Sequence, residues 1–475
     1  MAELALGLGG ETVEAMFARA CELEKKGQVE EARAVYRALL EREPAHLGGL
    51  TNLANILFSA KEMAAAKGLY ERAVAAYPAH LPSRANLGNL LVKTGSIAAA
   101  REHFQAALKV DPEYRPAHAG LSFVLGDLGD PEQAAWHRRR AFADRCVVVA
   151  AYRGEKPPIR VLELVSTTGG NMRTDDFLSD RVFQRILVTT EFYDPKVVLP
   201  QHDLVVNAVG EADSASAALV GALAVVERTT APVINAPAAV MATGRCDVAR
   251  RLGGIAGVVT ARTVTLGREV LLGEEAGAAL AREGFAFPLL VRSPGFHGGE
   301  HFERVETEDE LAAVVEGLPG SELMVMEYLD ARGRDGQCRK YRVMMVDGRL
   351  YPLHVAISER WKIHYFSADM AESAANRAED AAFLADMEGV VGPRGMAALK
   401  AIERTLRLDY GGIDFALNEQ GEVLLFEANA TMAVVVPEKG ERWEYRRAAV
   451  ERIYKAVWEM LYGRARGGAG GERAA

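Results

Sequence analysis

The chain has 475 residues, of which 49% are hydrophobic and 25% charged, and it carries a formal net charge of −9 at pH 7. This composition is typical of a globular protein, and the negative charge argues against a nucleic-acid partner, which would require clustered basic residues. The longest apolar run, residues 217–226, is shorter than the ~20 residues that span a bilayer, so we expect no membrane partner. The four cysteines lack the spacing of a zinc or redox site, which favours a cytoplasmic protein with free thiols.

A repeat occupies the first part of the chain. Pro44, Pro78 and Pro112 stand 34 residues apart, and small and aromatic residues recur in phase with them. The recurring residues are Ala32, Ala66, Ala100, Tyr36, Tyr70 and Phe104. This period and these residue classes resemble the tetratricopeptide repeat, a pair of antiparallel helices in which small residues permit close packing and proline ends the second helix. A fourth, divergent unit begins near Arg115, so we expect an all-α solenoid over residues 10–145.

The next segment, residues 158–240, is predicted to be an α/β domain. Apolar runs at 159–166 and 202–210 have strand character, and an Ala-rich helical stretch and a third short strand follow them. This order predicts a parallel sheet, whose strands place ligand-binding loops at their carboxyl ends. The loop after the first strand is therefore a candidate substrate site, although a polar turn would have the same composition. Its candidate residues are Thr168, Gly169, Gly170 and Asn171, with Glu211 and Asp213 after the second strand.

The most informative motif lies between residues 410 and 432. Two alternating segments joined by a turn at 418–421 predict a hairpin, with Asp414 on one strand and Glu427 and Asn429 on one face of the other. Carboxylate and amide oxygens are suited to Mg²⁺, with Mn²⁺ as an alternative. Because unpaired carboxylates inside apolar strands are costly, we expect a cation at this point; a cross-strand polar pair facing solvent is the alternative.

This D…E-x-N pattern resembles the metal site of the ATP-grasp superfamily, whose members couple ATP hydrolysis to ligation through an acyl-phosphate. The resemblance spans about residues 160–460. It implies a pre-ATP-grasp α/β segment at 158–240, an α+β ATP-grasp domain at 241–462, and ATP with one or two Mg²⁺ ions as cofactors. The remaining residues, 463–475, are predicted to be a disordered tail.

Three arginines match basic residues that contact phosphates in this family. Arg245 opens a predicted helix, Arg292 lies in a predicted strand where relatives more often have lysine, and Arg342 lies in a hairpin with a DG turn. The resemblance implies that Arg292 and Arg342 also stabilise the charge of the transferred phosphoryl group. Lys340 stands where many relatives have an acidic residue, which makes the site more cationic.

Two further segments resemble the nucleotide-binding elements of the family. Residues 295–302 are similar to the glycine-rich loop that covers the phosphates, and residues 322–330 are similar to the hinge strand that pairs with adenine. The nucleotide contacts implied by these segments are Gly295, His297, Gly298, Gly299, Met326, Glu327, Tyr328 and Leu329, with Asp335 as a ribose contact.

Residues 356–370 have no clear counterpart in the family and are rich in basic and aromatic side chains. We expect Lys362 to hold a substrate carboxylate and His364 to act as a base toward an amine, although both would also be compatible with packing. Lys340 and His354 complete the predicted substrate contacts.

These motifs predict an ATP-dependent carboxylate–amine, or less favourably thiol, ligase. Its carboxylate substrate would be a small molecule or peptide, and the repeats would dock a peptide or protein, unless they serve only oligomerisation or packing. Two other functions remain open: a nucleotide-binding scaffold that recruits partners through the repeats, and an ATP-grasp kinase that phosphorylates without ligation.

Overall fold

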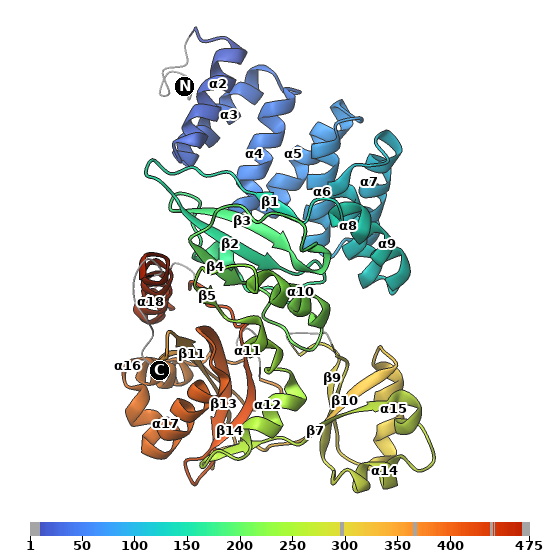
Figure 1. Cartoon of the computed structure of the whole chain (residues 1–475), viewed down its shortest axis with the longest axis vertical. Helices are drawn as coiled ribbons and strands as arrows, with labels where there is room; N and C mark the ends of the chain where they lie inside the picture. Colours follow the sequence, from blue (N-terminus) through green and yellow to red (C-terminus); the bar gives the residue numbers. More distant parts are fainter. Residues whose placement is uncertain (1–9, 295–298, 364–367, 438–439, 441, 468–475) are drawn as a thin grey trace. The chain divides into compact units, whose positions relative to one another are not determined.

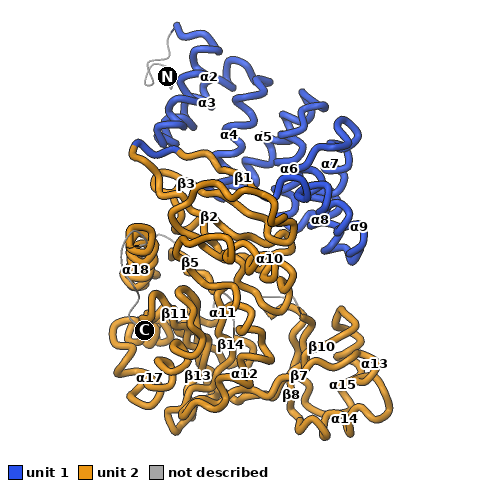
Figure 2. Tube along the Cα trace, in the orientation of Figure 1, with its two compact units in different colours: residues 1–146, 153–155 blue, residues 147–152, 156–475 orange. Residues whose placement is uncertain are grey.

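The structure is a computed structural model that describes residues 10–294, 299–363, 368–437, 440 and 442–467. The chain divides into two compact units, which are coloured separately in Figure 2. The repeat unit comprises residues 1–146 and 153–155, and the α/β unit comprises residues 147–152 and 156–475. No helix in the described ranges is both long enough and apolar enough to cross a membrane.

The repeat unit is built of consecutive antiparallel helix pairs (Figure 1). Its helices are α2 (Val13–Lys25), α3 (Val29–Arg42), α4 (Leu47–Ser59), α5 (Met63–Ala76), α6 (Leu81–Lys93), α7 (Ile97–Val110), α8 (Arg115–Asp127) and α9 (Pro131–Phe142). The second helix of each of the first three pairs ends just before Pro44, Pro78 or Pro112, as the sequence predicts. The fourth pair begins at Arg115, also as predicted.

Close helix packing explains the small residues of the repeat. The ring of Phe104 is fully buried, and a Cβ atom added to Gly88 or Gly120 would lie only 2.6 or 2.2 Å from it. Tyr36 and Tyr70 hold the equivalent buried positions in the earlier pairs. The aromatic residue therefore fills the space that the small residues leave open.

The first sheet of the α/β unit is mostly parallel, as predicted. Its strands are β1 (Val147–Val149), β2 (Ile159–Val165), β3 (Phe183–Thr189), β4 (Leu204–Asn207) and β5 (Val233–Ile234), in the order β1-β3-β2-β4-β5. Helix α10 (Ser216–Val226) and the 3-10 turns η1 (Thr174–Asp176) and η2 (Thr190–Phe192) accompany them. The predicted start of this domain at residue 158 is wrong, because β1 pairs antiparallel with β3 and so belongs to the sheet.

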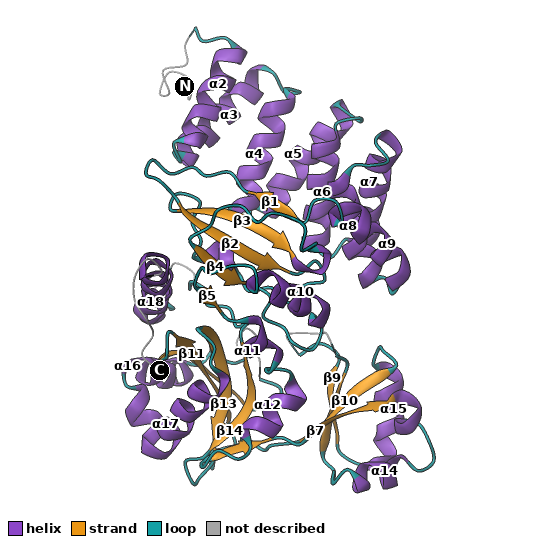
Figure 3. Ribbon diagram, in the orientation of Figure 1, coloured by secondary structure: helices purple, strands orange, loops and turns teal. Residues whose placement is uncertain are grey.

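Two antiparallel-rich sheets follow within the same unit (Figure 3). The second sheet has the order β7-β10-β8-β9 and consists of β7 (Thr263–Gly267), β8 (Leu289–Arg292), β9 (Phe302–Val305) and β10 (Glu322–Glu327). The third has the order β12-β11-β13-β14-β6 and consists of β6 (Val258–Thr260), β11 (Cys338–Val346), β12 (Arg349–Ser358), β13 (Tyr410–Leu417) and β14 (Val423–Asn429). The helices around them are α11 (Pro237–Met241), α12 (Arg245–Leu252), α13 (Arg268–Leu271), α14 (Ala276–Arg282), α15 (Glu308–Gly317), α16 (Ala374–Ala385), α17 (Met387–Leu406) and α18 (Glu444–Gly467).

Helix α18 corrects the predicted disordered tail, because it continues through residues 463–467. Arg464 anchors this end of the helix: its Nη2 atom lies 2.6 Å from Asp347 Oδ1 and 3.1 Å from Asp409 Oδ1. Residues 468–475 lie outside the described residues.

Candidate functional site

One cavity in the α/β unit collects most of the predicted site residues. It has a volume of about 320 Å³ and is lined mainly by β8, β10, β11, β13 and β14. The predicted residues on its wall are Arg245, Arg292, Gly299, Met326, Glu327, Tyr328, Leu329, Lys340, Arg342, Lys362, Asp414, Glu427 and Asn429. Residues that lie far apart in the sequence therefore face one space.

Strand pairing brings the acidic and basic residues of the third sheet together. Asp414 of β13 stands opposite Arg342 of β11 and opposite Glu427 of β14, and directly opposed residues share a face of a sheet. The register shifts between Asp414 and Phe415, which leaves Phe426 unpaired as a β-bulge. This bulge places Glu427 on the face of Asp414, whereas Leu425 lies on the face of Phe415 in the hydrophobic core.

Asp414 is neutralised by the chain itself. Its side chain is only 3% exposed. Arg342 donates two hydrogen bonds to it, from Nε to Oδ1 at 2.5 Å and from Nη2 to Oδ2 at 2.7 Å. Lys340 adds a second positive charge, with its Nζ atom 3.2 Å from Oδ2. Burial raises the pKa of Asp414, but Arg342 and Lys340 outweigh it and hold that pKa well below its usual range. The carboxylate of Asp414 is therefore not unpaired, because two side-chain cations already neutralise it.

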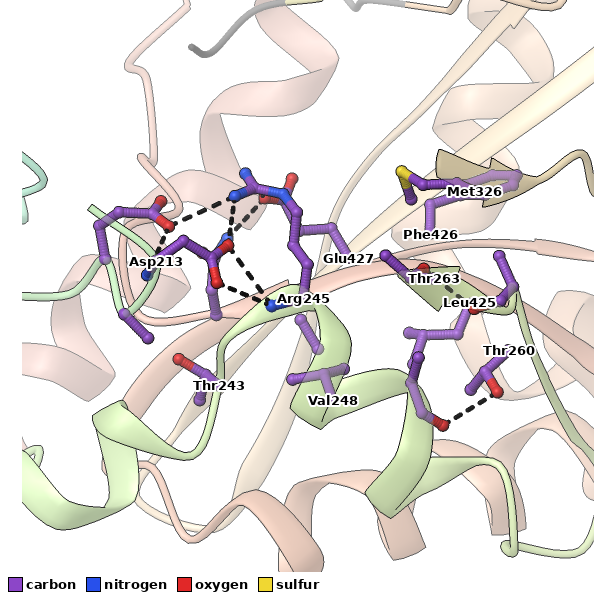
Figure 4. Close-up of a pocket in the computed structure, with 16 residues that line it drawn as sticks. Asp213, Thr243, Arg245, Val248, Thr260, Thr263, Met326, Leu425, Phe426 and Glu427 are labelled. Carbon is purple, nitrogen blue, oxygen red and sulfur yellow. Dashed lines mark hydrogen bonds and ion pairs between the residues drawn. The ribbon is translucent and has the colours of Figure 1, made fainter. Parts of the chain in front are cut away.

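Arg245 occupies a second charged cluster, in a small adjoining pocket of about 30 Å³ (Figure 4). Its Nη1 atom lies 2.6 Å from Asp213 Oδ2 and 3.4 Å from Glu211 Oε1, and its Nη2 atom lies 3.0 Å from Glu427 Oε1. Burial opposes the charge of Arg245, but the three carboxylates outweigh it and raise its pKa. Asp213 and Glu211, predicted to face substrate, thus link the first sheet to Glu427 through this arginine.

Arg292 sits in a different electrostatic environment. Its guanidinium packs over the ring of Phe302, with 5.3 Å from Cζ to the ring centroid. Burial lowers the pKa of Arg292, and the positive charge of Arg245 lowers it further. An anion bound beside Arg292 would therefore stabilise its charged form.

The end of β10 forms an aromatic wall of the cavity. Tyr328 packs edge-on against Trp361 with 6.2 Å between ring centroids, and Trp361 packs edge-on against Phe302 at 5.6 Å. Arg304 stacks over Tyr328, with Cζ 4.0 Å from the ring centroid. A planar apolar group would find contact surface beside Met326 here.

Lys362 lines the cavity, but its ammonium group is bound to residues of β9. Its Nζ atom donates to the backbone oxygen of Phe302 at 2.7 Å and lies 3.5 Å from Glu303 Oε1. The absence of a side chain at Gly299 leaves room for it, because a Cβ there would lie 3.0 Å from Lys362 Cε. Lys362 thus connects the segment after β12 to the start of β9.

The predicted substrate loop at Thr168, Gly169, Gly170 and Asn171 does not line the cavity. Asn171 instead makes two 2.8 Å hydrogen bonds to the backbone of Ser166, and Thr168 bonds the Ser166 hydroxyl. The loop nevertheless abuts the Arg245 cluster, because a Cβ on Gly170 would lie 2.5 Å from Glu211 Cβ. The loop therefore packs beside Glu211 and is not part of the cavity wall.

Two other predicted contacts lie away from the cavity wall. Asp335 is bound by Arg339 at 2.8 Å rather than placed at a ribose site. His354 is 5% exposed and its Nδ1 lies 3.2 Å from Arg446 Nη2, so the predicted substrate contact of His354 is wrong. Burial, together with the nearby charges of Arg342 and Arg446, lowers the pKa of His354 well below its usual value.

Four predicted residues, Gly295, His297, Gly298 and His364, lie outside the described residues. The cavity is also lined by Phe302, Trp361 and Thr431, which were not predicted as site residues. Only the aromatic character of the segment around Trp361 signalled this wall. Thr431 donates from its backbone nitrogen and its hydroxyl to Asn429 Oδ1, each at 3.0 Å, a contact that the E-x-N motif alone does not reveal.

Of the two carboxylates Asp414 and Glu427, Glu427 is the one that the chain neutralises less completely. The described part of the chain contains no cluster of three or more His, Cys, Asp and Glu side chains suited to a metal. Glu427 has a side chain that is 32% exposed, and its Oε2 atom makes no hydrogen bond within that part of the chain. A hard cation at this oxygen would complete its coordination with water and ligand oxygens, as Mg²⁺ commonly does.

The comparisons with known proteins concern the repeat unit. Residues 17–80 and residues 57–122 each match a tetratricopeptide repeat family model. Residues 17–122 are tetratricopeptide repeats. Such repeats are associated with protein–protein interaction and scaffolding, and a mixed α/β region follows the tetratricopeptide repeats in this chain.

Solved structures similar to the chain include two of MamA. A crystal structure of MamA has 16% sequence identity, covers 30% of this chain and 82% of that chain, and gives a TM-score of 0.28. MamA 41-end from Desulfovibrio magneticus RS-1 has 24% identity, covers 30% of this chain and 83% of that chain, and gives a TM-score of 0.27. No curated protein matches the chain.

Proposed function

We propose that the α/β unit is an ATP-grasp ligase that joins a carboxylate to an amine, or less favourably to a thiol, through an acyl-phosphate. The observation that carries this proposal is the composition of one cavity wall. Five basic side chains and an oxygen-donor set suited to Mg²⁺ face the same space as an aromatic and apolar wall. This combination matches the three chemical parts of magnesium-bound ATP: phosphates, metal and base.

The phosphates would bind among Arg292, Arg342, Lys340 and Arg245. The lowered pKa of Arg292 supports this placement, because a bound anion restores the stability of its charged form. Glu427, with Asn429 beside it, would hold Mg²⁺, which neutralises phosphate charge when it is bound. The adenine would lie against the end of β10, at Met326–Leu329.

The reaction would proceed in two displacements. A carboxylate oxygen of the substrate forms a bond to the γ-phosphorus while the bond from that phosphorus to the bridging oxygen of ADP breaks. The amine nitrogen then attacks the acyl carbon, inorganic phosphate leaves, and the nitrogen loses a proton. Arg292 and Arg342 would stabilise negative charge during phosphoryl transfer, and Lys362 would orient the carboxylate.

The tetratricopeptide repeats would dock a peptide or protein that carries one of the two substrates. Their core is separate from that of the α/β unit, which supports an independent binding role. Removal of residues 1–145 should therefore raise KM for the true substrate and leave basal ATP hydrolysis intact. Equal loss of both would mean that the repeats are structural. We propose that the protein acts in the cytoplasm, where ATP is available.

The test measures ADP release from ATP in the presence of candidate carboxylates and amines, together with the identity of the product. Glu427→Gln should reduce ADP release by roughly a hundredfold or more. Glu419→Gln is the matched control, because Glu419 is exposed and pairs with Arg334 away from the cavity. ADP with a new amide supports the ligase, whereas ADP with a phosphorylated product indicates a kinase. Nucleotide binding without turnover indicates a scaffold.

A further inference from the structure

Two of the three carboxylates that line the cavity, Asp414 and Glu427, differ in how completely the chain neutralises them. Asp414 is almost fully buried, and both its oxygens receive hydrogen bonds from Arg342. Lys340 adds a second positive charge, at 3.2 Å from Oδ2. Two cations thus face one carboxylate, and a divalent ion bound to Asp414 would experience repulsion from both of them.

Lys340 occupies this place because of strand geometry. It precedes Arg342 by two residues on β11, so both side chains project from the same face toward β13. The side chain of Lys340 is 17% exposed and lines the cavity. Its ammonium group therefore contacts the carboxylate at the cavity wall, which both residues line.

Glu427 is neutralised less completely than Asp414. Its side chain is about one-third exposed, and only Oε1 is engaged, by Arg245 and by Asn429 Nδ2. Arg245 also forms ion pairs with Asp213 and Glu211, so it neutralises the charge of Glu427 only in part. Of the two carboxylates, Glu427 is the one with an oxygen available for a divalent ion.

We propose that the ammonium group of Lys340 takes the place of a divalent cation on Asp414, so that the nucleotide-loaded site holds one divalent ion, on Glu427. This inference rests on the proposed function and deepens it by stating the number of metal ions. Lys340 is then the internal counter-ion of Asp414. Removal of its charge opens Asp414 to a second divalent ion.

The experiment counts Mn²⁺ bound to the full-length protein that is saturated with a non-hydrolysable ATP analogue, by electron paramagnetic resonance of free Mn²⁺. The wild-type protein should bind one Mn²⁺ per chain, and Lys340→Gln should bind two. Lys400→Gln is the matched control, because Lys400 lies 3.6 Å from Glu388 and outside this cavity. It should bind one Mn²⁺ like the wild type.

Two Mn²⁺ ions in the wild type, or one in both the wild type and Lys340→Gln, would overturn the inference. The wild-type count requires no variant, so it tests the inference even if Lys340→Gln fails to fold. Binding of the ATP analogue is measured separately by calorimetry. A wild-type protein that binds the analogue with two Mn²⁺ ions refutes only this inference, whereas one that binds no analogue refutes the proposed function as well.

Discussion

Replacement of Asp414 by asparagine should destabilise the α/β unit strongly. The substitution keeps the shape of the side chain but leaves Arg342 and Lys340 without their shared counter-charge, in a position where the carboxylate is 3% exposed. Removal of one partner from a buried ion pair costs about 3–5 kcal/mol. With a urea dependence of about 3 kcal/mol per molar, the unfolding midpoint of this unit should fall by about 1–1.7 M.

Tryptophan fluorescence in a urea titration measures this change, because three of the four tryptophans, Trp361, Trp443 and Trp458, belong to the α/β unit. The matched control is Asp335→Asn, which removes the same group from an exposed pair with Arg339 and should leave the midpoint unchanged. A loss of less than about 1 kcal/mol in Asp414→Asn would refute the assignment of Asp414 as the counter-charge of two buried cations.

Three further predictions follow from the same structure. Because Arg342 and Lys340 depress the pKa of Asp414, its contribution to stability is complete above its unfolded pKa of about 3.9 and is lost as the pH falls through the folded value. The stability difference between wild type and Asp414→Asn should therefore be constant from about pH 5 to 8 and shrink below about pH 4; a difference that changes near neutrality would contradict this. Gly120→Ala should cost about 1–3 kcal/mol in the unfolding of the repeat unit alone, measured by circular dichroism, because its Cβ would lie 2.2 Å from the ring of Phe104; an unchanged repeat transition would contradict the close packing. Gly299→Ala should weaken binding of an ATP analogue by up to about tenfold in calorimetry, since Gly299 has φ +82° and faces Lys362; unaltered affinity would show that this backbone does not shape the site.

Local patterns in the sequence predicted much of the fold. The proline spacing predicted the helix ends of the repeats, and the apolar runs predicted β2, β4 and β5 and their parallel order. Strands β1 and β3 were missed, because a short exposed strand such as β1 has no pattern of its own. Its identity as a strand depends on backbone pairing with β3.

The bulge at Phe426 illustrates the limit of pattern reasoning. Strict alternation would place Leu425 and Glu427 on one face of β14, whereas the extra residue puts them on opposite faces, with Leu425 on the face of Phe415 and Glu427 on the face of Asp414. The hairpin and the shared face of Glu427 and Asn429 were correctly predicted, because both residues follow the bulge. The position of Leu425 on the opposite face could be established only from the pairing of β14 with β13.

The sequence by itself determined which residue types are available for a site and which short elements carry them, since helix and strand periodicity are local properties. Only the tertiary structure decided how the charges are paired. It placed Lys340 and Arg342 on Asp414, and Arg245 among carboxylates from the loop after β4 and from β14. The physical reason is that an ion pair depends on distance in space and on burial, and neither is set by separation along the chain.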